Sequence, residues 1–154
     1  MESFRSELFD LPNMVEFVRV LARLTVAALL GGLLGLERER EGKAAGLRTH
    51  MLVALGSALF TVGPLEAGMN AADLSRVFQG IVTGIGFIGA GTILKRAEEQ
   101  EIQGLTTAAN LWLTAAVGMA VGLGHLWLPI LGATLAVLIL AVIGYVEKTI
   151  RRSR

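Results

Sequence analysis

One stretch of the sequence has the spacing of a nucleotide-binding loop. Gly84-Ile-Gly86-Phe-Ile-Gly89 matches GxGxxG, in which glycines let the backbone approach a pyrophosphate. That chemistry requires a preceding strand and an acidic residue at the end of the next strand. The candidate acid, Glu101, lies in a polar run, and the flanking segments are too long and too apolar for βαβ units. We therefore interpret the glycines as helix-packing residues and expect no nucleotide cofactor.

The other reactive side chains do not form a known catalytic pattern. The chain has no cysteine, which excludes disulfides, thiolate catalysis and zinc–sulfur sites. No Ser/His/Asp elbow, HExxH or phosphate loop occurs. We interpret His50 and His125 as interfacial residues at opposite membrane surfaces, and Glu98, Glu99 and Glu101 as a solvated loop, with attraction of hydrated magnesium as the alternative. We expect no enzyme, no cofactor and no metal site.

Composition indicates that lipid surrounds much of this chain. Of its 154 residues, 53% are hydrophobic and 18% are charged, whereas soluble domains carry about 25% charged residues. The mean hydropathy is +0.62. The net charge is +1 and the basic residues do not gather on one face, so we expect no nucleic-acid partner. We predict an all-α polytopic membrane protein forming one domain over residues 1–154.

Residues 77–94 form the stretch around which we expect the other helices to pack. They carry no charge until Lys95, and at ~1.5 Å per residue they nearly match a hydrocarbon core of ~30 Å. Small residues four apart, as in Gly80/Gly84 and Gly86/Ala90, let membrane helices approach closely. The glycines predicted to pack helices or line a pathway are Gly80, Gly84, Gly86, Gly89 and Gly91. We also predict a homo-oligomer, preferably a dimer, formed through a glycine face.

Four further spans complete a predicted five-helix bundle. They cover residues 14–36, 46–65, 105–123 and 126–146, after a polar or interfacial segment at 1–13 and before a basic tail at 147–154. Asn13 is a helix-start signal, and Asp73 or Ser75 can cap the helix at 77–94. Residues 102–146 carry no formal charge and would form a helix twice as long as a membrane is thick, so we place a turn at 122–125.

Basic residues determine the predicted orientation. Most of them fall in the segments that five spans place on the side of the C-terminus, so we predict the N-terminus outside and the C-terminus in the cytoplasm. Trp127 and Tyr145 then lie at the outer and inner interfaces, whereas Trp112 is predicted to pack inside the bundle.

Charged residues flank the first predicted turn. Glu37 and Arg38 stand where the first span leaves the membrane, and Arg48 where the second enters it. We interpret them as a functional charge cluster at the cytoplasmic mouth of the bundle. The alternative is an ordinary charged turn that fixes topology.

Two arginines lie near spans but away from the inner turns. Arg23 is too deep to snorkel easily, so we group it with the functional charges and expect it to face a partner helix or a wet cavity. Arg76 and Gln79 belong to the outer interface, where Arg76 binds headgroup phosphate, pairs with Asp73 or simply snorkels.

The fourth span begins with polar residues. Thr106 and Asn110 lie four apart and share a face, and Thr107 follows Thr106. A hydrogen bond between such groups across a helix interface in a membrane contributes ~0.6 kcal/mol of stability on average. These residues either hold helices together or form a polar lining beside the glycine-rich helix predicted at 77–94.

Four blocks of the sequence together resemble the MgtC/SapB family of bacterial inner-membrane proteins. The blocks are Gly35-Leu-Glu37-Arg-Glu39, Ala45-Gly-Leu-Arg48-Thr49, Gly84-Ile-Gly-Phe-Ile-Gly-Ala-Gly91-Thr92 and Gly104-Leu-Thr-Thr-Ala-Ala-Asn-Leu-Trp112. The resemblance implies five membrane helices, the plasma membrane, a link to growth in low magnesium and regulation of other membrane proteins. Well-studied virulence members continue into a soluble C-terminal domain, so we expect a short form without it.

Three functions are compatible with these residues. The first is a non-enzymatic regulator that binds other membrane proteins through glycine-rich helices. The second is a transporter or channel for magnesium or another solute, although the later spans lack the carboxylates that magnesium prefers, and only backbone carbonyls at a broken helix would replace them. The third is a structural membrane scaffold.

Overall fold

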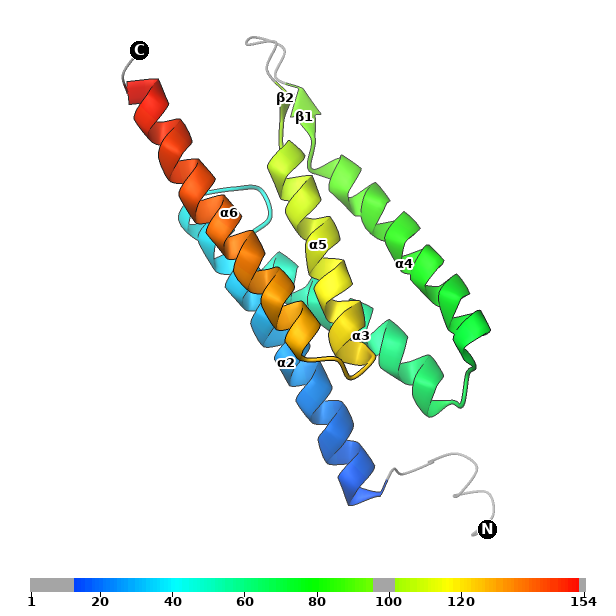
Figure 1. Cartoon of the computed structure of the whole chain (residues 1–154). Helices are drawn as coiled ribbons and strands as arrows, with labels where there is room; N and C mark the ends of the chain where they lie inside the picture. Colours follow the sequence, from blue (N-terminus) through cyan, green and yellow to red (C-terminus); the bar gives the residue numbers. More distant parts are fainter. Residues whose placement is uncertain (1–12, 96–101, 153–154) are drawn as a thin grey trace.

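Five helices make up nearly all of the computed structural model, which describes residues 13–95 and 102–152. They are α2 (Met14–Arg40), α3 (Leu47–Glu66), α4 (Ala71–Gly91), α5 (Leu105–Gly122) and α6 (Trp127–Arg152) (Figure 1). Strands β1 (Leu94–Lys95) and β2 (Ile102–Gln103) form a two-residue antiparallel ladder between α4 and α5. The predicted segment at 1–12 and the glutamates at 98, 99 and 101 lie outside the described residues. The all-α prediction is confirmed.

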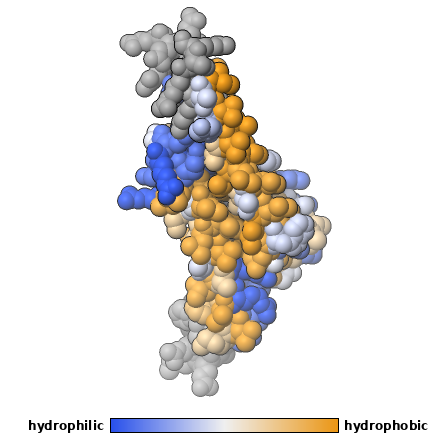
Figure 2. Space-filling view, turned by 60° about the vertical axis from the view of Figure 1, so that its left-hand side comes forward, coloured by the Kyte–Doolittle hydropathy of each residue, from blue (hydrophilic) through white to orange (hydrophobic). Residues whose placement is uncertain are grey.

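Four of the five described helices are long and apolar enough to cross a membrane. They are α2, α4, α5 and the part of α6 over Trp127–Val146. The fifth predicted span, α3, has the length but not the hydropathy, because Arg48, His50 and Glu66 lie in it. A polytopic membrane protein is confirmed. The large exposed apolar residues, which cover most of the face in Figure 2, are those expected of a lipid-facing surface.

Helix α3 lies between two of its neighbours, and α5, which contacts all four other helices, is the most buried one. Helix α3 packs against α2 on one side and α5 on the other. Each neighbour presents two glycines four residues apart, Gly31 and Gly35 on α2 and Gly118 and Gly122 on α5. A Cβ on Gly31 would lie 2.5 Å from the carbonyl oxygen of His50, so the two backbones are in direct contact there. Small residues thus bring two apolar helices close around α3.

The prediction that residues 77–94 form the central helix is wrong. α4 packs mainly on α5 at the edge of the bundle, and only Leu74, Ile85 and Gly89 are buried on it. Its other glycines do not pack closely on a neighbour, because a Cβ added at Gly80 or Gly84 would meet nothing within 4 Å. Glycine content shows that close approach is possible but not on which side a neighbour lies.

Local capping sets the starts of two helices. Asn13 Oδ1 accepts from the Glu16 N–H at 2.9 Å, and Glu16 Oε2 accepts from the Asn13 N–H at 3.2 Å, so the predicted start of α2 is confirmed. The cap of α4 is Asn70, whose Oδ1 accepts from the Asp73 N–H at 3.0 Å. The prediction of Asp73 or Ser75 as that cap is therefore wrong, and α4 begins about two turns earlier than expected.

The second half of the chain folds back through the predicted turn. Gly124, with φ of +89°, reverses the chain between α5 and α6. α6 continues to Arg152 instead of ending at 146, because nothing in its last residues breaks a helix. Trp127 and Tyr145 are exposed as expected at interfaces, but Trp112 is 53% exposed, so its predicted place inside the bundle is wrong.

Candidate functional site

A buried hydrogen-bonded node joins the three inner helices. His50 on α3 is fully buried and Asn110 on α5 is nearly so. Asn110 Nδ2 lies 3.0 Å from His50 Nε2 and 3.4 Å from the carbonyl oxygen of Leu34 on α2. We call His50, Asn110 and the Leu34 carbonyl the inner node. One amide group therefore links residues of α2, α3 and α5.

The geometry assigns the protons of the inner node. His50 Nδ1 lies 2.9 Å from the carbonyl oxygen of Gly46, which can only accept, so Nδ1 carries the hydrogen. In the neutral imidazole Nε2 is then the acceptor, and the Asn110 amide donates to it. All the donors and acceptors of this arrangement agree, which makes the node a specific clamp between helices.

The polar lining continues along α5 and α3. Thr107 and Thr114 are buried together with Asn110, and Thr114 Oγ1 donates to the Asn110 carbonyl at 2.7 Å. On α3, Thr61 Oγ1 donates to the Ser57 carbonyl at 2.8 Å. Within residues 13–95 and 102–152, every buried side-chain nitrogen or oxygen has a hydrogen-bond partner. The Thr61 and Thr114 hydroxyls thus bond to their own helices, four residues back, and the bonds between helices come from Asn110.

Thr106 does not belong to this lining. It is exposed, so its predicted shared face with Asn110 is not the buried face of α5. The buried polar residues are instead Thr107, Asn110 and Thr114, at i, i+3 and i+7. Thr107 and Asn110 thus lie where a polar lining was expected.

A second cluster lies one turn further along α2. Arg38 is only 4% exposed, and its Nε lies 2.6 Å from Glu37 Oε2. Its Nη2 lies 3.6 Å from Glu41 Oε2. A buried arginine needs such partners, because an unpaired charge is costly outside water. Of the predicted charge cluster, Glu37 and Arg38 are in contact, Glu41 is an additional member, and the functional role of the cluster stays a prediction.

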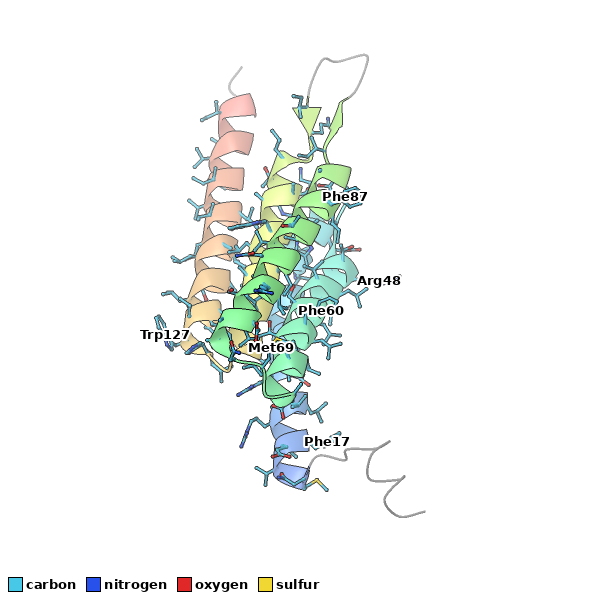
Figure 3. The ribbon with its side chains drawn as sticks, turned by 90° about the vertical axis from the view of Figure 1, so that its right-hand side faces the viewer. Phe17, Arg48, Phe60, Met69, Phe87 and Trp127 are labelled. Carbon is cyan, nitrogen blue, oxygen red and sulfur yellow. The ribbon has the colours of Figure 1, made fainter. Side chains whose placement is uncertain are left out.

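Arg48 lies apart from this cluster. It is two residues before His50, or about 200° around α3, so it points away from the inner helices. Figure 3 shows it extending outward on the side of α3 and α4. The structure therefore does not bring Arg48 to Glu37 and Arg38, and it lines a different surface.

Arg23 stands at the opposite end of α2, ~22 Å from Arg38 along the helix axis. Its Nη1 donates to the carbonyl oxygen of Gly122 at 3.2 Å, one of the last carbonyls of α5. The prediction that Arg23 faces a partner helix is confirmed, and its role there is to bind a helix C-terminus.

We expect Arg23→Gln to lower the free energy of unfolding by about 1–2 kcal/mol, since hydrogen bonds from charged donors contribute about that much. Arg19→Gln is the matched control, because Arg19 lies one turn earlier and is exposed. Thermal melts in detergent should separate the two variants. Equal melting temperatures would contradict a stabilising role for the Arg23–Gly122 bond.

The predicted glycines divide among three surfaces. Gly89 packs on α5, where its added Cβ would lie 3.4 Å from Ala108 Cβ. Gly80 and Gly84 line a groove between α3 and α4. Gly86 and Gly91 are exposed and have open space above them.

The predicted outer-interface residues, Arg76 and Gln79, are both exposed on α4. Asp73, the expected partner of Arg76, accepts from Asn70 Nδ2 at 2.7 Å. The aspartate thus stabilises the first turn of α4. The interfacial position of Arg76 stays a prediction.

The sequence interpretation missed the inner position of His50, whereas His125 is exposed at the α5–α6 turn as expected. A pattern in α3 points to it: His50, Ala54, Ala58 and Thr61 recur at helical spacing and are all buried. These small residues mark the face of α3 that both neighbours cover, and His50 is the first residue of that face.

Comparison with known proteins agrees with the earlier resemblance. The model of the MgtC family matches residues 24–149, which include the inner node and all five helices in whole or in large part. The chain belongs to the MgtC family. Among solved structures none matches.

Several curated relatives match the MgtC region. YhiD of Escherichia coli strain K12 is 47% identical over 127 residues, covering 78% of this chain and 58% of the relative. SrpB of Synechococcus elongatus is 44% identical over 130 residues, covering 77% and 71%. MgtC of Brucella abortus is 50% identical over 104 residues, covering 67% and 42%. The chain thus spans roughly half the length of YhiD and of Brucella MgtC.

Proposed function

We propose that this chain is a non-enzymatic protein of the bacterial inner membrane that acts in magnesium homeostasis by modulating other membrane proteins. Its membership of the MgtC family supports the magnesium link, as does the name of YhiD, which provisionally describes a magnesium transporter. The observation that supports the modulator role is an exposed face of α4 that consists mainly of small residues.

That face is built for contact with another helix. Gln79, Thr83, Gly86 and Ala90 are exposed along one side of α4, and we call them the outer face. A Cβ on Gly86 would meet nothing within 4 Å, and the Thr83 hydroxyl donates to the Gln79 carbonyl at 2.8 Å. Small and hydroxyl side chains at this spacing favour close helix association in lipid. A second copy of the chain or another membrane protein would dock here, and we expect a dimer.

Magnesium transport is the second candidate, and the name of YhiD favours it. The contacts inside the bundle favour modulation. His50 and Asn110 bond to each other, and Glu37 and Glu41 face Arg38, so these groups are engaged within the protein. Magnesium holds its water strongly and usually binds carboxylates. Transport would require these pairs to separate.

A paired assay distinguishes the candidates. Wild type, Gly86→Leu and the control Gly132→Leu, which alters an equally open glycine on α6, are compared in liposomes and in native membranes. We expect no magnesium flux above empty vesicles, a dimer by native mass spectrometry, and capture of membrane proteins that Gly86→Leu alone abolishes. Magnesium flux by wild type and Gly132→Leu that is lost in Gly86→Leu would establish the transporter instead.

A further inference from the structure

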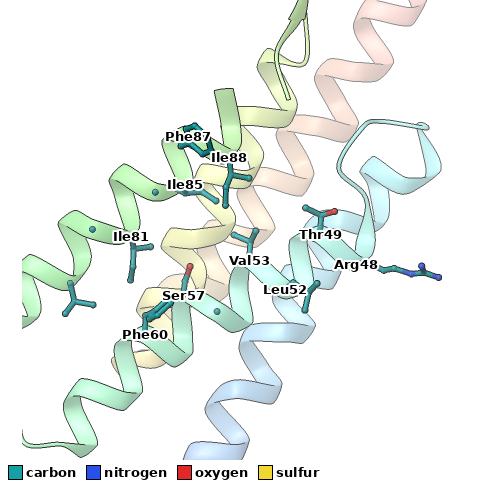
Figure 4. A pocket seen from close by; sticks show the side chains of 14 residues that line it. Arg48, Thr49, Leu52, Val53, Ser57, Phe60, Ile81, Ile85, Phe87 and Ile88 are labelled. Atoms are coloured by element: carbon teal, nitrogen blue, oxygen red, sulfur yellow. The ribbon is translucent and has the colours of Figure 1, made fainter. Parts of the chain in front are cut away.

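A long apolar groove runs between α3 and α4. Its volume is about 880 Å³, and its floor is formed by Val53, Ile81 and Ile85, which pack on Leu111 and Ala115 of α5 (Figure 4). Side chains at its rim are strongly exposed, with Phe60 at 64% and Phe87 at 85%. The groove is therefore open to the surroundings of the bundle along its length.

Glycines on both walls produce the hollow. Gly56 on α3 and Gly80 and Gly84 on α4 line the groove, and a Cβ at any of the three would meet nothing within 4 Å. Larger side chains at these positions would fill the space without touching the packed core. This makes the groove a surface that can be closed by substitution while the fold is kept.

The groove has one charged residue, at one end. Among its lining residues only Arg48 is charged, and Thr49 lies beside it (Figure 4). Arg48 starts α3 directly after the charged α2–α3 turn, where a membrane surface is expected. Guanidinium groups bind phosphate oxygens with two parallel, charge-assisted hydrogen bonds. A groove with a cation at its surface end and apolar walls below complements a molecule with an anionic head and an apolar tail.

The length of the groove indicates what kind of molecule it can hold. From Arg48 to Phe60 the α3 axis advances ~18 Å, at ~1.5 Å per residue. One leaflet is half of a hydrocarbon core of ~30 Å, or ~15 Å. The groove thus runs about the depth of one leaflet, which is the reach of a phospholipid, whereas a partner membrane helix would cross both leaflets.

We propose that this groove holds one anionic phospholipid, with its phosphate on Arg48 and its acyl chains along α3 as far as Phe60. The lipid lies against Gly80 and Gly84, whereas Gly86 of the outer face is about 200° further around α4 than Gly84. The lipid site is therefore independent of the helix-docking face and of the proposed function.

Lipid titration of delipidated protein, read by native mass spectrometry, tests the site. The probes are phosphatidylglycerol and phosphatidylcholine with identical acyl chains. We expect wild type to bind one phosphatidylglycerol per protomer about tenfold more tightly than phosphatidylcholine, since one charge-assisted contact is of that size. Arg48→Gln should remove the preference, and Gly84→Leu should weaken binding of both lipids. Arg40→Gln, which changes an exposed arginine of α2 outside the groove, should behave as wild type.

Three results would overturn the assignment. Equal affinity of wild type for both lipids, or an unchanged preference in Arg48→Gln, would mean that the groove carries only bulk lipid. If Gly84→Leu leaves lipid binding intact but converts dimers into monomers, a second copy of the chain fills the groove instead. Melting temperatures verify that each variant is folded, as expected from the exposure of Arg48 and the open space at Gly84.

Discussion

Gly118→Ala lowers the melting temperature of the detergent-solubilised protein by about 4–8 °C, given a net loss of about 2 kcal/mol from overpacking. The added Cβ would overlap the carbonyl oxygen of Ala54 and lie 2.9 Å from Ser57 Cβ. Both atoms belong to the rigid centre of α3, so α5 and α3 must move apart. That loss exceeds the gain in helix propensity of ~1 kcal/mol that alanine brings over glycine.

Gly132→Ala on α6 provides the matched control for this prediction. The same methyl group is added to a membrane helix, but nothing lies within 4 Å of it. The melting temperature should stay level or rise, because only the propensity gain remains. If both variants melt alike, α3 and α5 are not in the close contact described.

Asn110→Leu is expected to reduce the free energy of unfolding by about 1–3 kcal/mol. It removes the donor to the buried His50 Nε2, and a buried group left without a partner costs about that much. The Leu34 carbonyl lies within α2 and keeps its helical hydrogen bond. Thermal or denaturant unfolding in detergent measures the change. Thr106→Val, an exposed position one turn earlier on α5, should change it by less than about 0.5 kcal/mol.

A double-mutant cycle tests whether the two side chains act as a pair. The double variant His50→Leu/Asn110→Leu should lose less free energy of unfolding than the sum of the two single variants, by at least about 1 kcal/mol. The reason is that the double variant leaves fewer buried polar groups without a hydrogen-bond partner. Additive losses would contradict the inner node as a coupled unit.

Local patterns predicted the helices well and their arrangement poorly. Asn13 was readable as a cap because a capping box needs only residues three apart in sequence. The place of α3 between α2 and α5 was not readable from hydrophobicity, since burial does not follow hydropathy here: α5 is the most buried helix, and the more apolar α6 is mostly exposed. It becomes visible only when the glycine pairs of α2 and α5 are matched to Ala54 and Ala58 across the bundle.

The candidate site shows the same division. Glu37 and Arg38 are adjacent in sequence, so their pairing follows from local geometry. The inner node joins residues 60 and 76 positions apart, and no periodicity within one helix encodes that contact. Arg48 was grouped with Glu37 by its place near the turn, but the rotation of α3 directs it elsewhere.

The position of α3 between α2 and α5 has a consequence for biosynthesis. The ribosome delivers α3 before α4 and α5, so the side of α3 that carries Ser57 and Thr61 has no cover when it first reaches the translocon. Partition of α3 into lipid on its own is opposed by these uncovered hydroxyl groups and by Arg48 and His50 in its first turn. We therefore expect stable insertion of α3 to depend on the later arrival of α5.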